Sequence, residues 1–246
     1  MKNTNIIAMA GSGRRFVNKN FNLIKPLVLF RKKPMIFYAV KSLPFSEKKI
    51  FICRNNHFKS FKLNKVFKKY FKNFKFIKLS RKNSGQAISC YQALSRIPPD
   101  HIATFGSCDY YYSFNRRKFR NLLERFDLVI FVTKPDKIML KNPNQYGWVK
   151  KAEKNEVEKI NCKKTVSSKP KKDCVIVGSF SFKNKKIFAE SFKLMIKKNQ
   201  KINNEYYMDV VAKNTLLLDY KVGYINVSNY KNFGTPNALK SYEQNN

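Results

Sequence analysis

The chain opens on a short apolar strand that runs directly into a glycine-rich turn. Residues 6–10 are apolar, Gly-Ser-Gly stands at 11–13, and Arg14 and Arg15 follow. Glycines let the backbone turn tightly and bring its N–H groups against a phosphate, while cationic side chains supply the countercharge. Lys25 adds a further cation close by in the chain. This opening therefore predicts a cradle for a triphosphate at the end of the first strand.

The common phosphate-binding loops do not fit this segment. A P-loop ends in Gly-Lys-Ser/Thr, and nothing of that kind follows Gly13. The dinucleotide fingerprint needs a third glycine where Phe16 stands. Both of these motif classes are excluded, and the pattern that remains is G-x-G-x-R-F.

Apolar runs alternate with segments of helical spacing along most of the chain. Runs of strand length lie at 6–10, 50–53, 74–79, 101–105 and 128–133. From residue 145 onward shorter strands are expected at 146–150, 157–160 and 175–182, and helices at 185–196 and 206–218. This alternation predicts an α/β fold, with a mixed, mainly parallel sheet and helices on both faces in three Rossmann-like layers.

Residues 63–74 carry apolar side chains at helical spacing. The apolar positions are Leu63, Val66, Phe67, Tyr70, Phe71 and Phe74, with lysines on the other face. One helix through Phe74 accounts for this pattern. We expect a surface helix packed on the sheet, and a helix lying on a membrane surface is the alternative.

The net charge of +36 is uneven along the chain. Residues 1–99 contain 23 Lys or Arg and a single acid, Glu47. Such a field favours polyanions, whether a nucleoside triphosphate, a nucleic acid or an anionic membrane. Enrichment in Lys, Asn, Ile and Phe favours compositional bias as its main cause. Peripheral contact with an anionic membrane stays open, and no specific nucleic-acid partner is expected.

Other composition features indicate a reduced, cytoplasmic protein. There is no run of 18 apolar residues and no secretory signal pattern. The five cysteines are spread singly and form no C-x-x-C pair. The two histidines, His57 and His101, stand in contexts that suggest no catalytic role.

The G-x-G-x-R-F segment, followed by Lys-Pro-Leu at 25–27, resembles the sugar nucleotidyltransferases of bacterial capsule and lipopolysaccharide biosynthesis. These enzymes join a nucleoside triphosphate to a sugar 1-phosphate. Blocks resembling further family motifs follow in the family's order, at Met35–Val40, Gly85–Ala87, Asp109, Tyr146–Val149, Gly178–Phe182, Glu205–Asp209 and Gly234–Pro236. The resemblance covers nearly the whole chain. It implies a single nucleotidyltransferase domain of GT-A-like fold over 1–246, with a nucleotide-binding half at 1–135 and an acceptor half at 136–246.

The resemblance also assigns the nucleotide side of the site. It implies that Ala10, Gly11, Ser12 and Gly13 cradle the phosphates and that Gly85 and Gln86 edge the nucleobase. It places two catalytic cations, Arg15 at the β/γ end and Lys25 at the α-phosphate. Asp109 and Asp209 would hold Mg²⁺, which is the expected cofactor. An aspartate that caps the next helix is the alternative for Asp109.

Five residues are expected on the sugar-phosphate side: Tyr146, Gly147, Trp148, Lys163 and Glu205. An aromatic face and a close backbone approach suit a pyranose, although the aromatic residues here could equally be core. Glu205 and Asp209 would share one face if the helix included both. One departure concerns Cys162, which stands where the family usually carries a glutamate before the lysine. It leaves the natural acceptor open.

Functions other than sugar nucleotidyl transfer are alternatives. One is an inactive relative that binds nucleic acid or an anionic membrane, and it has no need for Asp109 and Asp209. Another is a cytidylyltransferase for a non-sugar phosphate such as phosphocholine. A glycosyltransferase would want a D-x-D-like pair, whereas Tyr110 and Tyr111 follow Asp109.

Overall fold

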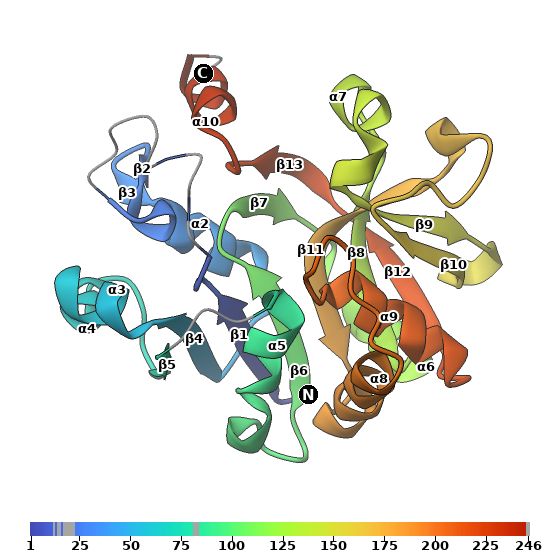
Figure 1. Ribbon diagram of the computed structural model, residues 1–246, viewed down its shortest axis with the longest axis horizontal. Coiled ribbons are helices and arrows are strands. Elements are labelled where there is room, and N and C mark those ends of the chain that lie inside the picture. Colours follow the sequence, from blue (N-terminus) through green and yellow to red (C-terminus); the bar gives the residue numbers. More distant parts are fainter. Residues whose placement is uncertain (12, 14–15, 17–22, 81–83, 245–246) are drawn as a thin grey trace.

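The structure is a computed structural model of the chain that describes residues 1–11, 13, 16, 23–80 and 84–244 (Figure 1). Its strands are β1 (Asn3–Ala8), β2 (Leu29–Phe30), β3 (Lys33–Pro34), β4 (Lys48–Arg54), β5 (Phe74–Leu79), β6 (Ile102–Ser107), β7 (Tyr110–Ser113), β8 (Leu128–Thr133), β9 (Gly147–Lys151), β10 (Val157–Cys162), β11 (Cys174–Phe182), β12 (Val222–Asn226) and β13 (Ser228–Asn232). Its helices are α2 (Met35–Ser42), α3 (Asn55–Ser60), α4 (Leu63–Lys68), α5 (Gln86–Tyr91), α6 (Arg116–Arg125), α7 (Lys137–Lys141), α8 (Lys185–Lys197), α9 (Met208–Leu217) and α10 (Pro236–Gln244).

A mixed sheet runs through the centre of the molecule. Its order is β10-β9-β11-β6-β1-β4-β5, and β8 pairs with β11 and carries β12. The pairs β5–β4, β4–β1, β1–β6 and β8–β12 are parallel, whereas β11 is antiparallel to each of its partners. Parallel neighbours bring the carboxyl ends of β1, β4 and β6 to one edge, which is where open α/β sheets bind ligands.

Helices cover both faces of the sheet, as the alternation in the sequence predicts (Figure 1). On one face α5, α8 and α9 pack on the strands through Cys90, Phe188 and Val211. On the other face α2, α4 and α6 pack through Ile36, Phe67 and Leu122. Successive strand residues point to opposite faces, so Ile6 joins the first cluster and Ile7 the second. The predicted fold class is confirmed.

The single helix expected over 63–74 is wrong in its second half. Helix α4 ends at Lys68, the chain turns, and Phe74 begins β5. Asn73 has a φ of 47°, in the left-handed region, and redirects the chain into the strand. Phe71 and Phe74 nevertheless reach the same aromatic cluster as Phe67, so the apolar pattern reports burial rather than a continuous helix.

The lysines of this region lie in water. The side chains of Lys62, Lys65, Lys69 and Lys72 are all exposed.

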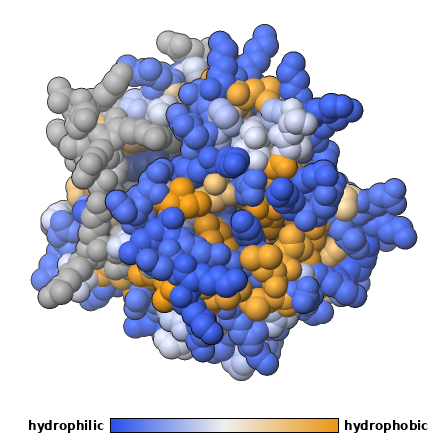
Figure 2. Space-filling model, turned by 45° about the vertical axis from the view of Figure 1, so that its right-hand side comes forward, coloured by the Kyte–Doolittle hydropathy of each residue, from blue (hydrophilic) through white to orange (hydrophobic). Residues whose placement is uncertain are grey.

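Hydrophilic side chains cover most of the face in Figure 2, and hydrophobic ones gather near its centre. No helix of the described ranges has both the length and the apolar character needed to span a bilayer.

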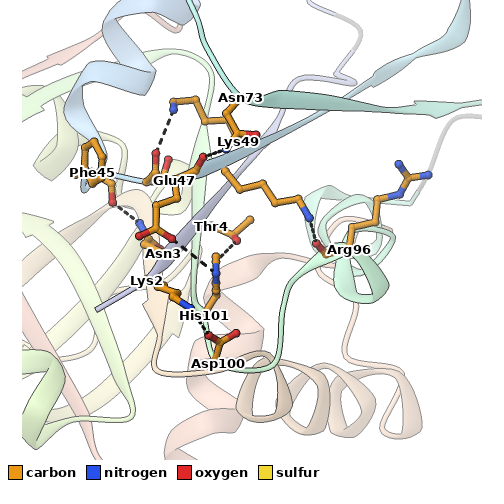
Figure 3. A network of polar contacts seen from close by, with 12 residues as sticks. Lys2, Asn3, Thr4, Phe45, Glu47, Lys49, Asn73, Arg96, Asp100 and His101 are labelled. Carbon is orange, nitrogen blue, oxygen red and sulfur yellow. Dashed lines mark hydrogen bonds and ion pairs between the residues drawn. The ribbon is translucent and has the colours of Figure 1, made fainter.

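A polar network closes the edge of the sheet opposite the glycine-rich turn, at the start of β1 (Figure 3). The side chain of Asn3 donates to the carbonyl of Phe45, 3.1 Å away. His101 Nδ1 lies 2.9 Å from the Thr4 hydroxyl, and its Nε2 lies 3.8 Å from a Glu47 carboxylate oxygen. His101 therefore ties the start of β6 to its neighbours, which is a structural role.

Gly85 shows how tightly the first half of the chain packs on the second. The Tyr206 N–H donates to the Ser84 carbonyl at 2.8 Å, and the Ala87 N–H donates to the Tyr206 carbonyl at 3.1 Å. A Cβ atom on Gly85 would lie 2.9 Å from the carbonyl carbon of Tyr206 and closer still to its N and O atoms. The φ of Gly85 is 112°, which side chains rarely tolerate.

We expect Gly85→Ala to lower the free energy of unfolding by roughly 3 kcal/mol, because backbone strain and steric overlap both act at this position. Urea denaturation followed by circular dichroism measures it. Gly11→Ala is the matched control, since a Cβ there meets no described atom within 4 Å. Equal stability of the two variants would contradict the packing argument.

Candidate active site

An ion pair stands at the carboxyl edge of the sheet. Lys25 Nζ lies 2.5 Å from Asp109 Oδ2, and both side chains are largely buried, with exposed fractions of 21% and 11%. Lys25 begins a short 3-10 helix, Lys25–Leu27, in which Pro26 and Leu27 are buried. Asp109 lies two residues after Ser107, the last residue of β6. Residues that are 84 positions apart thus meet where β1 and β6 end.

The Asp109 carboxylate is held from both sides. The Ser107 hydroxyl donates to Oδ1, while Lys25 holds Oδ2. The backbone carbonyl of Asp109 accepts from the Phe233 N–H at 2.8 Å. These contacts hold the carboxylate in its buried position. Strand β7, and not a helix, follows Asp109 in the chain, so the carboxylate has no helix to cap. The helix-cap alternative is therefore excluded.

Asn232 is a residue that the sequence reasoning missed. In the antiparallel pair β13–β7 it lies opposite Tyr110, one residue from Asp109. A Cβ atom on Gly234 would lie 2.6 Å from Asn232 Oδ1 and 3.6 Å from Asp109 Oδ2, so both oxygens surround the same glycine. The available signal was the Gly-Thr-Pro block, because Asn232 comes just before it.

The glycine-rich turn lies beside Lys25. A Cβ atom on Gly13, whose φ is 63°, would lie 3.6 Å from Lys25 Cβ. The Ala10 carbonyl accepts from Nε of Arg54, 2.8 Å away, so the end of β4 anchors the start of the turn. Arg54 is a second residue that the sequence reasoning missed. The expected contributions of Ser12 and Arg15 lie outside the described residues.

The expected nucleobase turn forms the amino end of α5. Gly85 precedes the helix and Gln86 is its first residue. The hydrogen bonds between 84–87 and Tyr206 hold this turn against the segment that leads into α9. The structure therefore brings the expected nucleotide edge next to the Glu205–Asp209 block.

Asp209 lies among the expected acceptor residues. A Cβ atom on Gly147 would lie 2.6 Å from Asp209 Cγ, so only glycine allows this approach. The Cys162 thiol donates to the Asp209 carboxylate, and the charge of Lys163 also stabilises it. Burial raises the pKa of Asp209 from 3.8 to about 6, against the lowering effect of Cys162 and Lys163. Burial also raises the pKa of the Cys162 thiol, which keeps it protonated.

Lys163 and Tyr207 flank this carboxylate. Lys163 Nζ donates to the Gln145 carbonyl at 3.3 Å and lies 5.1 Å from the centre of the Tyr207 ring. The Lys163 N–H donates to the Tyr146 carbonyl at 2.9 Å, which ties the end of β10 to the start of β9. The structure thus brings together Tyr146, Gly147, Lys163 and Asp209.

Two expectations about this side need correction. Glu205 does not share a helix face with Asp209, because α9 begins at Met208 and Glu205 lies in the preceding turn. The Trp148 indole is completely buried and donates to the Pro143 carbonyl at 2.9 Å. It belongs to the core and offers no face to a sugar, because successive strand residues alternate and Gly147 takes the side toward Asp209.

Tyr110 interacts with both carboxylates. Burial, and then the charges of Asp109 and Asp209, raise its pKa well above 10. Its ring centre is 5.7 Å from that of Tyr230. A Cβ atom on Gly178, with φ of 78°, would lie 2.8 Å from the Tyr110 ring. The phenol of Tyr110 is therefore kept neutral beside the Asp109 and Asp209 carboxylates.

The donor set around Asp109 fits a hard divalent cation that keeps other ligands. Carboxylate and amide oxygens are ligands that suit Mg²⁺, which usually completes its shell with water and substrate phosphates. Asn232 Oδ1 accepts from the Gly234 N–H at 2.7 Å and keeps one further lone pair for a cation. Within the described ranges no group of three His, Cys, Asp or Glu forms an all-protein cage.

Comparison with known proteins identifies the family and the fold relatives of this chain. The sequence model of the family described as "Nucleotidyl transferase" matches residues 4–241. No curated protein matches the sequence.

Solved structures share the fold over almost the whole chain. A nucleoside-diphosphate-sugar pyrophosphorylase from Vibrio cholerae RC9 is 17% identical, with a TM-score of 0.79, and 98% of this chain aligns with 99% of that one. The inositol-1-phosphate CTP transferase from T. maritima is 16% identical, with a TM-score of 0.76 over 98% of this chain and 94% of that one. A UDP-glucose pyrophosphorylase complexed with UDP-glucose is 13% identical, with a TM-score of 0.75 over 100% of both chains.

The raised pKa of Asp209 predicts a pH-dependent stability. Between about pH 4 and pH 6 the folded protein binds more protons at this carboxyl than the unfolded chain, so the free energy of unfolding falls as the pH rises. The rise of the pKa from 3.8 to about 6 corresponds to roughly 3 kcal/mol. Asp209→Asn has no carboxyl group to titrate at this position, so its free energy of unfolding should not fall with rising pH for this reason.

We therefore expect the stability of Asp209→Asn relative to wild type to improve by about 2 kcal/mol between pH 4 and pH 7.5. Urea denaturation at the two pH values measures the difference. Asp219→Asn, at an exposed position beyond α9, is the control and should show no such change. A difference for Asp209→Asn that stays constant with pH would contradict the raised pKa.

Proposed function

The chain belongs to the nucleotidyl transferase family, and we propose that it joins a nucleoside triphosphate to a sugar 1-phosphate, releasing pyrophosphate. The product would be an NDP-sugar for surface polysaccharide synthesis. The ion pair of Lys25 and Asp109 carries this proposal, because it places a cation and a carboxylate together beside a glycine-rich turn. A protein that only binds anions has no use for a buried carboxylate at that place.

The proposed reaction needs little proton chemistry. A phosphate oxygen of the acceptor attacks the α-phosphorus, and the bond from this phosphorus to the bridging oxygen breaks, with pyrophosphate leaving. The protein must offset repulsion between the anions and stabilise charge on the α-phosphate and the leaving group. Lys25 would bind the α-phosphate, and the backbone N–H groups of the turn at 10–13 would bind the phosphates with Arg15.

The proposed cofactor is Mg²⁺, which supplies Lewis-acid stabilisation of phosphate charge when bound. Asp109 would hold it, and the Asn232 amide oxygen is the second group that the geometry favours. Asp209 was expected as a second metal ligand. Its contacts with Gly147, Cys162 and Lys163 favour a role in orienting the acceptor instead.

Tyr146, Gly147, Lys163 and Glu205 would form the acceptor side. Lys163 lies beside Tyr207 and would neutralise the acceptor phosphate. The carboxylate that relatives place at position 162 is a thiol here, and that thiol donates to Asp209. One fold relative is an inositol-1-phosphate CTP transferase, so an acceptor that is not a sugar is the second candidate.

A pyrophosphate-release screen tests the function. It combines four ribonucleoside triphosphates and dTTP with a panel of sugar 1-phosphates, inositol 1-phosphate and phosphocholine. Acceptor-dependent release of pyrophosphate by one pair supports the proposal. Tight triphosphate binding with no release of pyrophosphate for any pair would favour the alternative, a catalytically inactive member of the family.

For the pair found, we expect Asp109→Asn to lower turnover by about 100-fold or more, the usual cost of removing one strong electrostatic stabiliser. Asp100→Asn is the control, because it also loses an aspartate that pairs with a lysine, but on the exposed surface. Circular dichroism checks that both variants fold. Wild-type turnover in Asp109→Asn at low magnesium would refute the assignment.

A further inference from the structure

The amine of Lys25 lies at the oxygen of Asp109 that would face a bound metal. The distance from Nζ to Oδ2 is 2.5 Å, and the Ser107 hydroxyl holds the other oxygen. In the described part of the chain, Lys25 is the one cationic side chain that forms an ion pair with this carboxylate. The chain therefore places one of its own cations at the carboxylate that is proposed to hold the metal.

Two cations cannot share this oxygen at low cost. Lys25 and Asp109 are both largely shielded from water, and like charges repel more strongly where the effective dielectric constant is low. A divalent ion that reaches Asp109 Oδ2 must therefore displace the ammonium group of Lys25. A displaced ammonium group in a buried site is costly unless another anion accepts it.

A triphosphate supplies that anion. Gly13 lies beside Lys25, so a phosphate in the glycine-rich turn offers the ammonium group a new charge-assisted hydrogen bond. Lys25 keeps a side-chain exposure of 21%, which leaves it room to move toward that ligand.

We propose that Lys25 reserves the metal site by pairing with Asp109 until a triphosphate draws it away, so that metal and triphosphate bind cooperatively. This inference rests on the proposed function, since it assigns Lys25 and Asp109 to one reaction site. Coupling between two ligands is reciprocal, so each would raise the affinity of the other. The pair would also keep the site from binding a divalent ion without its substrate.

If Lys25 competes with the metal for Asp109, removing its ammonium group should strengthen metal binding even when no nucleotide is present. Removing the ammonium group frees Asp109 Oδ2, so Lys25→Met should bind Mn²⁺ more tightly than wild type in the absence of any nucleotide. We expect a gain of about tenfold or more, equivalent to about 1.4 kcal/mol. Titration of Mn²⁺ followed by electron paramagnetic resonance measures free and bound ion directly.

Three further variants make the result specific. Lys2→Met removes a lysine from another lysine–aspartate pair, Lys2 and Asp100 at 3.2 Å on the exposed surface, and should leave the Mn²⁺ affinity unchanged. Lys25→Met combined with Asp109→Asn should lose the gain. Lys25→Arg changes the side chain at the same position but keeps a cation, so its Mn²⁺ affinity should resemble that of wild type. Circular dichroism checks that Lys25→Met folds.

Equal Mn²⁺ affinities of wild type and a folded Lys25→Met would overturn the proposal. The same gain in Lys2→Met would do so as well, because it would trace to net charge alone. A gain that persists without the Asp109 carboxylate would place the metal elsewhere. None of these readouts uses turnover, so the pyrophosphate screen and the Mn²⁺ titration can fail independently.

Discussion

The ion pair between Lys25 and Asp109 is the interaction on which the rest of the site depends. It joins the segment after the glycine-rich turn to the end of β6, and each partner is held by further contacts. Because the strands β4, β1 and β6 are parallel neighbours, their carboxyl ends bring Arg54, Ala10 and Asp109 to one edge. In a chain with a net charge of +36, a buried carboxylate is scarce, and its position marks where a cation is needed.

Close approach at glycines fixes the second half of the site. Gly85 admits the backbone of Tyr206, Gly147 admits the carboxylate of Asp209, and Gly178 admits the ring of Tyr110. Each glycine belongs to a different strand or turn, so this part of the proposed site is assembled by packing rather than by one loop. The phenol of Tyr110 interacts with both carboxylates, and their charges help to keep it protonated.

The sequence predicted the fold through its alternation of apolar strands and helices, and β5 and β8 have the expected bounds. It also predicted Lys25 and Asp109 as site residues, which the structure brings into contact, although their catalytic and metal-binding roles remain predictions. The Gly-Thr-Pro block pointed to the neighbourhood of Asn232 but not to its partner, because the pairing of β13 with β7 is a long-range contact that no local pattern reports. Trp148 was expected beside the sugar for its aromatic face, with a core position as the alternative; the structure buries it, and strand periodicity alone does not say which face is buried. The helix over 63–74 failed for a related reason, since a turn and an edge strand can bury the same aromatic residues.

Anomalous diffraction from a crystal grown with Mn²⁺ and a nucleoside triphosphate tests the central claim most directly. The account predicts an anomalous peak at Asp109, with Lys25 Nζ moved from the carboxylate to a phosphate of the nucleotide. A nucleotide bound in the crystal while Lys25 stays paired with Asp109 and no Mn²⁺ lies beside this carboxylate would contradict it.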